Sequence, residues 1–162
     1  AKTLQNGWLH TGDLAEYTDN GMLRIRGRKK EVLKTSGGKM IAPLPIEEQI
    51  KVAPIISQVC IVGDGRKYLT ALVTLSDAKL RELQEGKLDL NQTVIESTEL
   101  HQEVKKYFDE VNQTLASYEQ IKRFAILSRE FSVEGGEMTP TLKMKRNVIE
   151  SRYREIIDRM YA

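Results

Sequence analysis

Basic residues and glycines gather in one stretch of the sequence, residues 27–43, where they could bind a phosphate group. Four consecutive charged residues occupy positions 28–31, and the bend Thr-Ser-Gly-Gly-Lys occupies positions 35–39. Glycines permit positive φ and close approach of a ligand, and the hydroxyl and amide groups of such a bend can receive phosphate oxygens. A β-hairpin with a solvated basic edge explains the same residues. From this stretch alone, the hairpin is the simpler interpretation.

A second loop, residues 131–141, leads to a lysine that could reach a neighbouring site. It contains two adjacent glycines at 135 and 136, then hydroxyl residues, and it places Lys143 at the start of a predicted terminal helix. A lysine there can bind a carboxylate or a phosphate as a compact charge. Positive charge at a helix N-terminus opposes the helix dipole, so an anionic ligand would compensate it. Ordinary surface lysines at a helix start are the alternative.

Asp13 is a third candidate, because it follows Gly12 near the end of a predicted strand. Its carboxylate can accept hydrogen bonds from two ribose hydroxyls, although a cap on the following turn is the simpler role. His101 has no second histidine or cysteine nearby, so we expect no metal site in this chain.

The composition is that of a globular domain with a substantial core. The chain has 162 residues, 40% of them hydrophobic and 30% charged, and a net charge of +2, which does not call for nucleic acid. The aromatic residues nearest the basic stretch, Trp8 and Tyr17, lie in apolar strand contexts, which disfavours RNA stacking. The single Cys60 and the lack of a signal peptide or spanning segment predict a cytoplasmic protein, or one peripheral to a membrane. The chain starts with Ala1 and reads as part of a larger protein.

Residue patterns predict the elements that must position these candidates. The turn Asp19-Asn20-Gly21 lies within a β-meander over residues 5–26. Strands are expected at 57–62, 69–75 and 121–127, and helices at 45–50, from Asp77 to Glu85 with Ser76 as cap, from Thr98, and from Lys143. This order predicts an α+β fold, in which a small antiparallel sheet of about three strands is covered by helices and preceded by a β-hairpin and the meander.

Three motifs, in this order and spacing, resemble the final motifs of AMP-forming adenylating enzymes. They are Thr11-Gly12-Asp13, the stretch Gly27-Arg28-Lys29-Lys30 through Gly37-Gly38, and Thr139-Pro140-Thr141-Leu142-Lys143. More narrowly, they are similar to long-chain fatty acid CoA ligases, in which Lys-Thr-Ser-Gly-Gly-Lys and Met-Thr-Pro-Thr-Leu-Lys are typical. The resemblance covers the whole chain.

The resemblance implies two pieces of a larger enzyme. Residues 1–29 would be the end of the large N-terminal adenylation domain, including its terminal β-meander, and residues 30–162 the mobile C-terminal domain. Lys30 would be the hinge about which the second piece rotates.

The resemblance also implies a nucleotide site. Asp13 would bind the ribose of ATP and acyl-AMP with help from Arg28, and Lys143 would be the catalytic lysine that bridges the carboxylate and the α-phosphate. Leu142 stands where the wider superfamily usually has Gly, a change that the long-chain group shares.

CoA would bind at Gly37, Gly38 and Lys39 after the rotation, according to the same resemblance. The implied substrates are a fatty acid, ATP and CoA, with Mg²⁺ held by ligands in the large domain. Another adenylate-forming enzyme, such as an aryl or medium-chain CoA ligase, and a standalone basic binding module are the alternatives.

Overall fold

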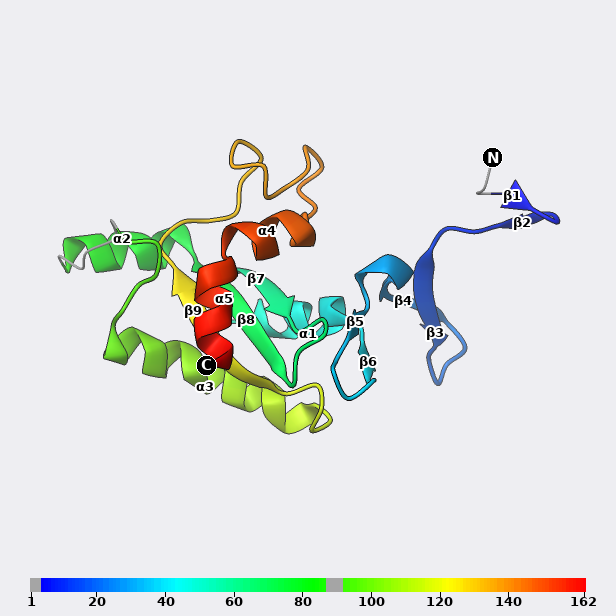
Figure 1. Ribbon diagram of the computed structural model, residues 1–162, viewed down its shortest axis with the longest axis horizontal. Helices are drawn as coiled ribbons and strands as arrows, with labels where there is room; N and C mark the ends of the chain where they lie inside the picture. The colour runs from blue at the N-terminus through cyan, green and yellow to red at the C-terminus, as the bar shows by residue number, and fades with distance from the viewer. Residues whose placement is uncertain (1–3, 87–91) are drawn as a thin grey trace.

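The computed structural model describes residues 4–86 and 92–162. Its elements follow one another along the chain as coloured in Figure 1. The first strands are β1 (Leu4–Gln5), β2 (Trp8–Leu9), β3 (Asp13–Tyr17) and β4 (Leu23–Arg28), followed by the 3₁₀ turn η1 (Lys29–Glu31), β5 (Leu33–Lys34) and β6 (Met40–Ile41). The remaining elements are α1 (Pro43–Ile50), β7 (Ile56–Val62), β8 (Leu69–Leu75), α2 (Asp77–Glu85), α3 (Thr98–Thr114), β9 (Ile121–Leu127), α4 (Arg146–Arg152) and α5 (Arg154–Tyr161).

The first strands form two separate antiparallel ribbons, β1–β2 and β3–β4, where the sequence predicted one meander. The predicted turn at Gly21 is confirmed, with φ of 77° at that glycine. Figure 1 shows the ribbons extending away from the helices. Their apolar side chains are solvent-exposed: Trp8 is 75% and Tyr17 80% exposed, although the sequence places both in apolar strand contexts.

A three-stranded sheet, in the order β7-β8-β9, forms the centre of the remaining chain. β7 and β8 pair antiparallel, as predicted, but β9 runs parallel to β8. A parallel neighbour requires a long crossover, and the segment with α2 and α3 provides it. The α+β class with a small three-stranded sheet is confirmed, and the all-antiparallel pairing is corrected at β9.

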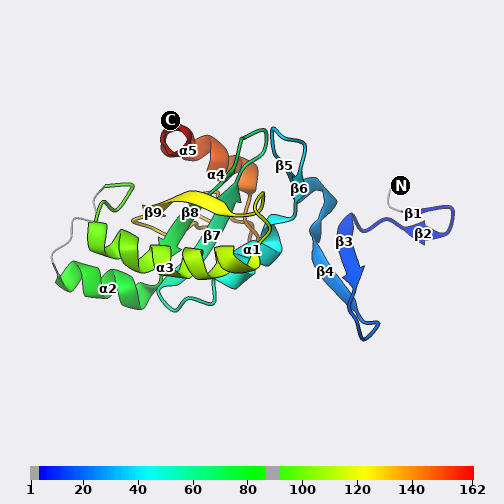
Figure 2. The same ribbon diagram turned by 90° about the horizontal axis from the view of Figure 1, so that it is seen from below.

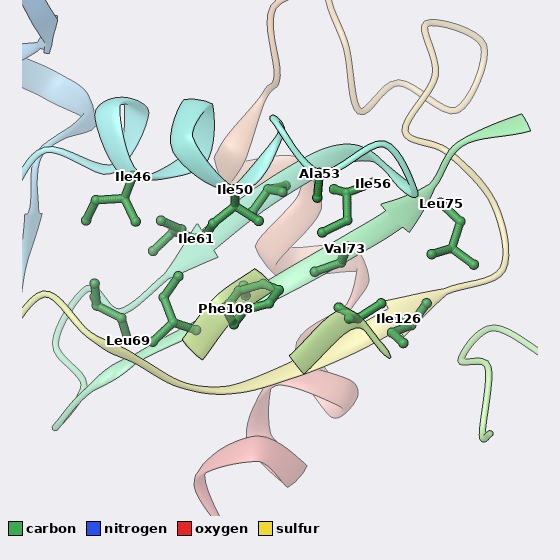
Figure 3. Packing of buried hydrophobic residues seen from close by; sticks show 14 of the residues in the cluster. Ile46, Ile50, Ala53, Ile56, Ile61, Leu69, Val73, Leu75, Phe108 and Ile126 are labelled. Atoms are coloured by element: carbon green, nitrogen blue, oxygen red, sulfur yellow. The ribbon is translucent and has the colours of Figure 1, made fainter. Parts of the chain in front are cut away.

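Helices cover both faces of this sheet, and Figure 2 shows α3 and α5 on opposite sides of it. On one face Val59, Ile61 and Val73 pack with residues of α1 and α3 such as Phe108, as Figure 3 shows in part. On the other face Cys60 and Leu72 pack with residues of α4 and α5. The alternation along each strand divides the side chains between the two cores.

Helix boundaries agree with the sequence in the middle of the chain and differ at its end. Ser76 caps α2 by accepting a hydrogen bond from the Lys79 amide, and α2 ends before Gly86 as expected. The single terminal helix predicted from Lys143 is wrong: the helix begins at Arg146 and is interrupted at Tyr153, giving α4 and α5. In the described parts of the chain, none of the helices combines the length and apolar character that a bilayer crossing requires.

Candidate functional site

The β3–β4 ribbon brings Asp13 and Arg28 together as cross-strand partners. Arg28 Nε donates to Asp13 Oδ1 at 3.1 Å, and the Asp13 amide donates to the Thr11 hydroxyl at 3.1 Å. Gly12 has φ of 78°, and its carbonyl accepts from the Lys29 amide, which fixes the corner before β3. Both charged side chains remain partly exposed, so a ribose could reach the carboxylate beside a guanidinium.

Lys30 lies in η1, the single 3₁₀ turn that joins the β3–β4 ribbon to the rest of the chain. Its side chain is exposed, and no side chain caps this turn. None of the residues of η1 is buried, so a change of φ and ψ there would disrupt little packing. Its use as a hinge stays a prediction.

The turn between β5 and β6 holds Gly37, Gly38 and Lys39, and the backbone amides on both sides of Gly37 are already paired. Gly38 N donates to Thr35 O at 2.9 Å, Lys39 N to Thr35 Oγ1 at 3.2 Å, and Ser36 N to Arg66 O at 2.8 Å. These bonds hold most of the turn's amides inside the protein, and β5 and β6 pair antiparallel, which agrees with the simpler interpretation of this stretch as a β-hairpin.

The two glycines of this turn differ in backbone conformation. Only Gly38 has a left-handed φ, of 79°, and Gly37 does not need one. A Cβ added at Gly37 would meet just the Thr35 hydroxyl, at 3.9 Å. Gly37 is exposed, so the space beside it is open to a ligand. Lys39 Nζ lies 5.3 Å from the centre of the Tyr118 ring, which holds that ammonium group near the protein surface.

Lys143 lies at the end of a tight exposed turn that starts at Thr139. Thr139 N donates to Lys143 O at 2.8 Å, and Lys143 N donates to Thr139 Oγ1 at 3.0 Å. Leu142, immediately before the lysine, has φ of 57°, in the left-handed region that glycine prefers. Because α4 begins only at Arg146, Lys143 does not lie at a helix N-terminus, and the dipole argument is wrong.

The structure keeps the candidates in separate places. In Figure 1 the loop before α4 is separate from the β3–β4 ribbon. Asp13 and Arg28 contact each other within that ribbon. A cavity of about 450 Å³ lies between α3, β9 and α5, and another of about 680 Å³ borders α4 and α5. None of the predicted site residues lines either cavity. Residues 4–86 and 92–162 contain no group of three His, Cys, Asp or Glu side chains placed to bind a metal ion.

Two buried carboxylates beside the Lys143 turn are functional candidates that the sequence reasoning missed. Glu137 is completely buried; burial raises its pKa, but hydrogen bonds from Arg129 and neighbouring donors lower that pKa more, to about 2. Glu47 is 1% exposed and pairs with Arg146. The sequence signals were the adjacent glycines before Glu137 and the arginine three residues after Lys143. By contrast, burial raises the pKa of the Cys60 thiol to about 12, which excludes a nucleophilic thiolate.

Residues 30–162 match the family described as AMP-binding enzyme C-terminal domain. The chain belongs to this family, and its resemblance to the C-terminal part of AMP-forming acyl-CoA synthetases is confirmed.

Its sequence relatives are long-chain fatty acid CoA ligases. The ligase ACSBG1 of Rattus norvegicus is 36% identical over 176 residues, covering 96% of this chain and 24% of that protein. The ligase FadD15 of Mycobacterium tuberculosis is 34% identical over 164 residues, covering 96% of this chain and 27% of that protein. The chain thus spans about a quarter of the length of these curated relatives.

Solved structures with the same fold are adenylate-forming enzymes. The adenylation domain of a carboxylate reductase from Mycobacterium chelonae has a TM-score of 0.80 at 23% identity, covering 99% of this chain and 24% of that chain. The O-succinylbenzoate CoA synthetase of Bacillus subtilis, in complex with AMP, has a TM-score of 0.59 at 24% identity. The match covers 90% of this chain and 24% of that chain. At these identities the similarity establishes the shared fold.

Proposed function

We propose that this chain is the C-terminal part of an ATP-dependent, AMP-forming long-chain fatty acid CoA ligase. Residues 1–29 would end the large adenylation domain and residues 30–162 would form the mobile domain. The observation that carries the proposal is the 36% identity to such a ligase over 96% of the chain. Carboxylate activation by ATP and transfer to CoA need one site to serve two unlike transition states, which a rotating domain allows.

In the first half-reaction a fatty acid carboxylate oxygen attacks the α-phosphorus of ATP, and pyrophosphate leaves to give acyl-AMP. Asp13 and Arg28 would hold the ribose, and the Lys143 ammonium would stabilise the negative charge on the carboxylate and the α-phosphate. The exposed turn that ends in Lys143 supports this role, because the lysine can enter a site formed by another domain. Mg²⁺ would accompany ATP and would be held by residues of the large domain.

In the second half-reaction the domain would rotate about Lys30, withdrawing Lys143 and presenting the Gly37-Gly38-Lys39 turn to CoA. The CoA thiol loses its proton, its sulfur attacks the acyl carbonyl carbon, and AMP leaves. The open space beside Gly37 supports its place along the pantetheine arm. ATP and CoA as substrates, together with a single buried thiol, suit a cytoplasmic enzyme or one at a membrane surface.

A standalone basic binding module is the second candidate. Trp8 and Tyr17 are exposed, and Tyr17 pairs with Leu23 beside the basic Arg24 of β4, which favours this module more than the sequence suggested. The similarity of the whole chain to CoA ligases favours the enzyme, and an aryl or medium-chain ligase remains the alternative within that class.

Half-reaction measurements on the full-length parent protein test the ligase proposal. Lys143→Ala should lower adenylation, measured by pyrophosphate exchange, by more than about 10²–10³-fold, the usual effect of losing an oxyanion contact. Thioester formation from supplied acyl-AMP should stay near the parent rate. Gly37→Leu should show the opposite pattern, and its fold should be intact because the position has room.

Lys106→Ala, on the exposed face of α3, is the matched control and should change neither rate. Equal loss of both half-reactions in Lys143→Ala would refute the role assigned to this lysine. A parent protein with no fatty-acid-dependent pyrophosphate exchange would refute the ligase itself.

A further inference from the structure

The turn that carries Lys143 is exposed, yet its conformation is unusually constrained. Met138 and Met144 form an antiparallel bridge at its base, and Leu142 N donates to Thr139 O at 2.8 Å inside it. The left-handed φ of Leu142 is unfavourable for a side chain with a Cβ. Such a conformation persists only where the surrounding structure fixes it. The flanks of the turn must therefore supply the constraint.

Glu137, two residues before the turn, is the anchor on its N-terminal side. Its carboxylate accepts from Arg129 Nη2 at 2.8 Å, Arg152 Nη1 at 2.8 Å, Tyr153 Oη at 3.0 Å and the Ser132 amide at 3.2 Å. Both carboxylate oxygens are thus occupied by groups from the loop itself, the end of β9 and α4. A fully buried carboxylate with four donors has a defined position.

The backbone of Glu137 connects the fixed carboxylate to the turn through two hydrogen bonds. Its carbonyl accepts from the Lys145 amide at 2.7 Å, and its amide donates to Ser132 O at 3.1 Å. Lys143 therefore lies in the segment between Glu137 and Lys145, two residues whose backbones are hydrogen-bonded to each other. Moving the Glu137 carboxylate would shift both strands of the small hairpin that ends in Lys143.

The Glu137 carboxylate lies so close to position 135 that only glycine fits there. A Cβ at Gly135 would lie 2.2 Å from Glu137 Oε2 and 2.9 Å from Ser132 Oγ, too close for any side chain. Gly135 does not have a left-handed φ, so room for the carboxylate, and not backbone conformation, requires glycine here. The loop is built around Glu137.

Arg146 is the anchor on the C-terminal side of the turn. It donates to both carboxylate oxygens of Glu47, at 2.8 and 3.1 Å, and to Ile61 O at 2.7 Å. The segment between Glu137 and Arg146 is therefore held at both ends, and Lys143 lies within it.

We propose that Glu137 is a positioning residue for Lys143. By fixing the base of the turn, it places the lysine ammonium where the fatty acid carboxylate and the α-phosphate react. Catalysis by such a charge depends on placement, and an error of about 1 Å can cost about 10²-fold in rate. This inference rests on the proposed role of Lys143 in adenylation.

The test uses the full-length parent with Glu137→Gln, which keeps the shape and removes the charge. We expect kcat for adenylation to fall about 10- to 100-fold, with KM for ATP and the thioester half-reaction within about 3-fold of the parent. Tyr153→Phe, which removes one of the four donors, should give a smaller loss of the same kind and keeps the test available if Glu137→Gln does not fold. Glu134→Gln, an exposed carboxylate of the same loop, is the control and should change nothing.

A double variant separates positioning from simple stability. If Glu137 acts through Lys143, then Glu137→Gln should cause no further loss of adenylation in a Lys143→Ala background. A full additional loss there, equal loss of both half-reactions, or unchanged adenylation in Glu137→Gln would overturn the inference. If Lys143→Ala itself leaves adenylation intact, the proposed function fails; if that variant is inactive and Glu137→Gln is not, just the positioning role fails.

Discussion

Removing the buried partner of Arg146 should strongly destabilise the domain. Glu47 in α1 and Arg146 in α4 are 2% and 14% exposed in their side chains, and together they pair with the backbone of Ile61 in β7. Ile61 N donates to Glu47 Oε1 at 2.8 Å, and Ile61 O accepts from Arg146 at 2.7 Å. The pair therefore also satisfies the backbone of β7, an edge strand of the sheet.

The size of the effect follows from what each change leaves behind. Glu47→Ala leaves a buried guanidinium without its carboxylate, which typically costs about 3–5 kcal/mol, and it also leaves the Ile61 amide unpaired. Arg146→Met leaves a buried carboxylate and should cost a similar amount. The double variant has neither unpaired charge, so its loss should be at least about 2 kcal/mol smaller than the sum of the two single losses. Domains of this size are typically stable by about 5–15 kcal/mol, so each single variant loses a large share.

These free energies are measured by urea unfolding, monitored by circular dichroism, on the 162-residue chain and on its residues 30–162 alone. Asp109→Ala is the control, because its pair with Lys105 has both side chains about half exposed and should contribute less than about 1 kcal/mol. Single losses below about 1 kcal/mol, or a double variant whose loss equals the sum, would refute the reasoning that the pair is buried and coupled.

Three further predictions concern the same chain. Burial raises the pKa of Glu137, but hydrogen bonds from Arg129 and other donors outweigh it and lower that pKa from 4.5 to about 2. The ionised carboxylate therefore adds about 3 kcal/mol to the free energy of unfolding above pH 4.5, and this contribution is lost as the pH falls to 2. Urea titrations between pH 7 and 2 should show this loss in the parent and a flatter profile in Glu137→Gln, and parallel profiles would contradict it. Leu142→Gly should raise the free energy of unfolding by up to about 1 kcal/mol, since glycine accepts φ of 57°, and so raise the midpoint of thermal unfolding slightly. A lowered midpoint would show that this conformation is not strained. Gly38→Ala, at φ of 79°, should cost about 1 kcal/mol in urea unfolding while Gly37→Ala stays within about 0.5 kcal/mol, and equal losses would contradict the backbone assignment.

Local patterns in the sequence predicted most elements, because their causes are local. Ser76 and Gly86 mark the ends of α2, and the apolar runs at 57–62, 69–75 and 121–127 coincide with β7, β8 and β9 within a residue. The pairing direction of β9 was missed, since nothing within 121–127 records the crossover that brings it beside β8. The sequence also predicts a polar connection over residues 87–97, and residues 87–91 of it lie outside the described part of the chain.

The candidate site was predictable where motifs name single residues and unpredictable where packing decides. Asp13 and Arg28 were singled out from motifs, and the structure brings them together across one ribbon. The adjacent glycines before Glu137 and the position of Arg146 after Lys143 mark these two residues in the sequence, but their burial could not be predicted, because a charged residue looks exposed until its partners are known. For Arg146 that partner is Glu47, 99 residues away. The start of α4 was placed too early for the same reason: the residues before it are held by these contacts and not by helical hydrogen bonds.

The positions of these anchors suit a domain that moves as a unit. The groups that fix the Lys143 turn, Glu137 and Arg146 with their partners, all lie after Lys30, whereas Asp13 and Arg28 lie before it. In the proposed mechanism, rotation about Lys30 would leave the internal geometry of both halves unchanged and alter just the relation between them. A lysine on a flexible loop would have to be ordered again in every catalytic cycle, at an entropic cost of about 1–2 kcal/mol for each residue fixed. A turn anchored inside its own domain avoids that cost, so Lys143 can be withdrawn for thioester formation and return already ordered for the next adenylation.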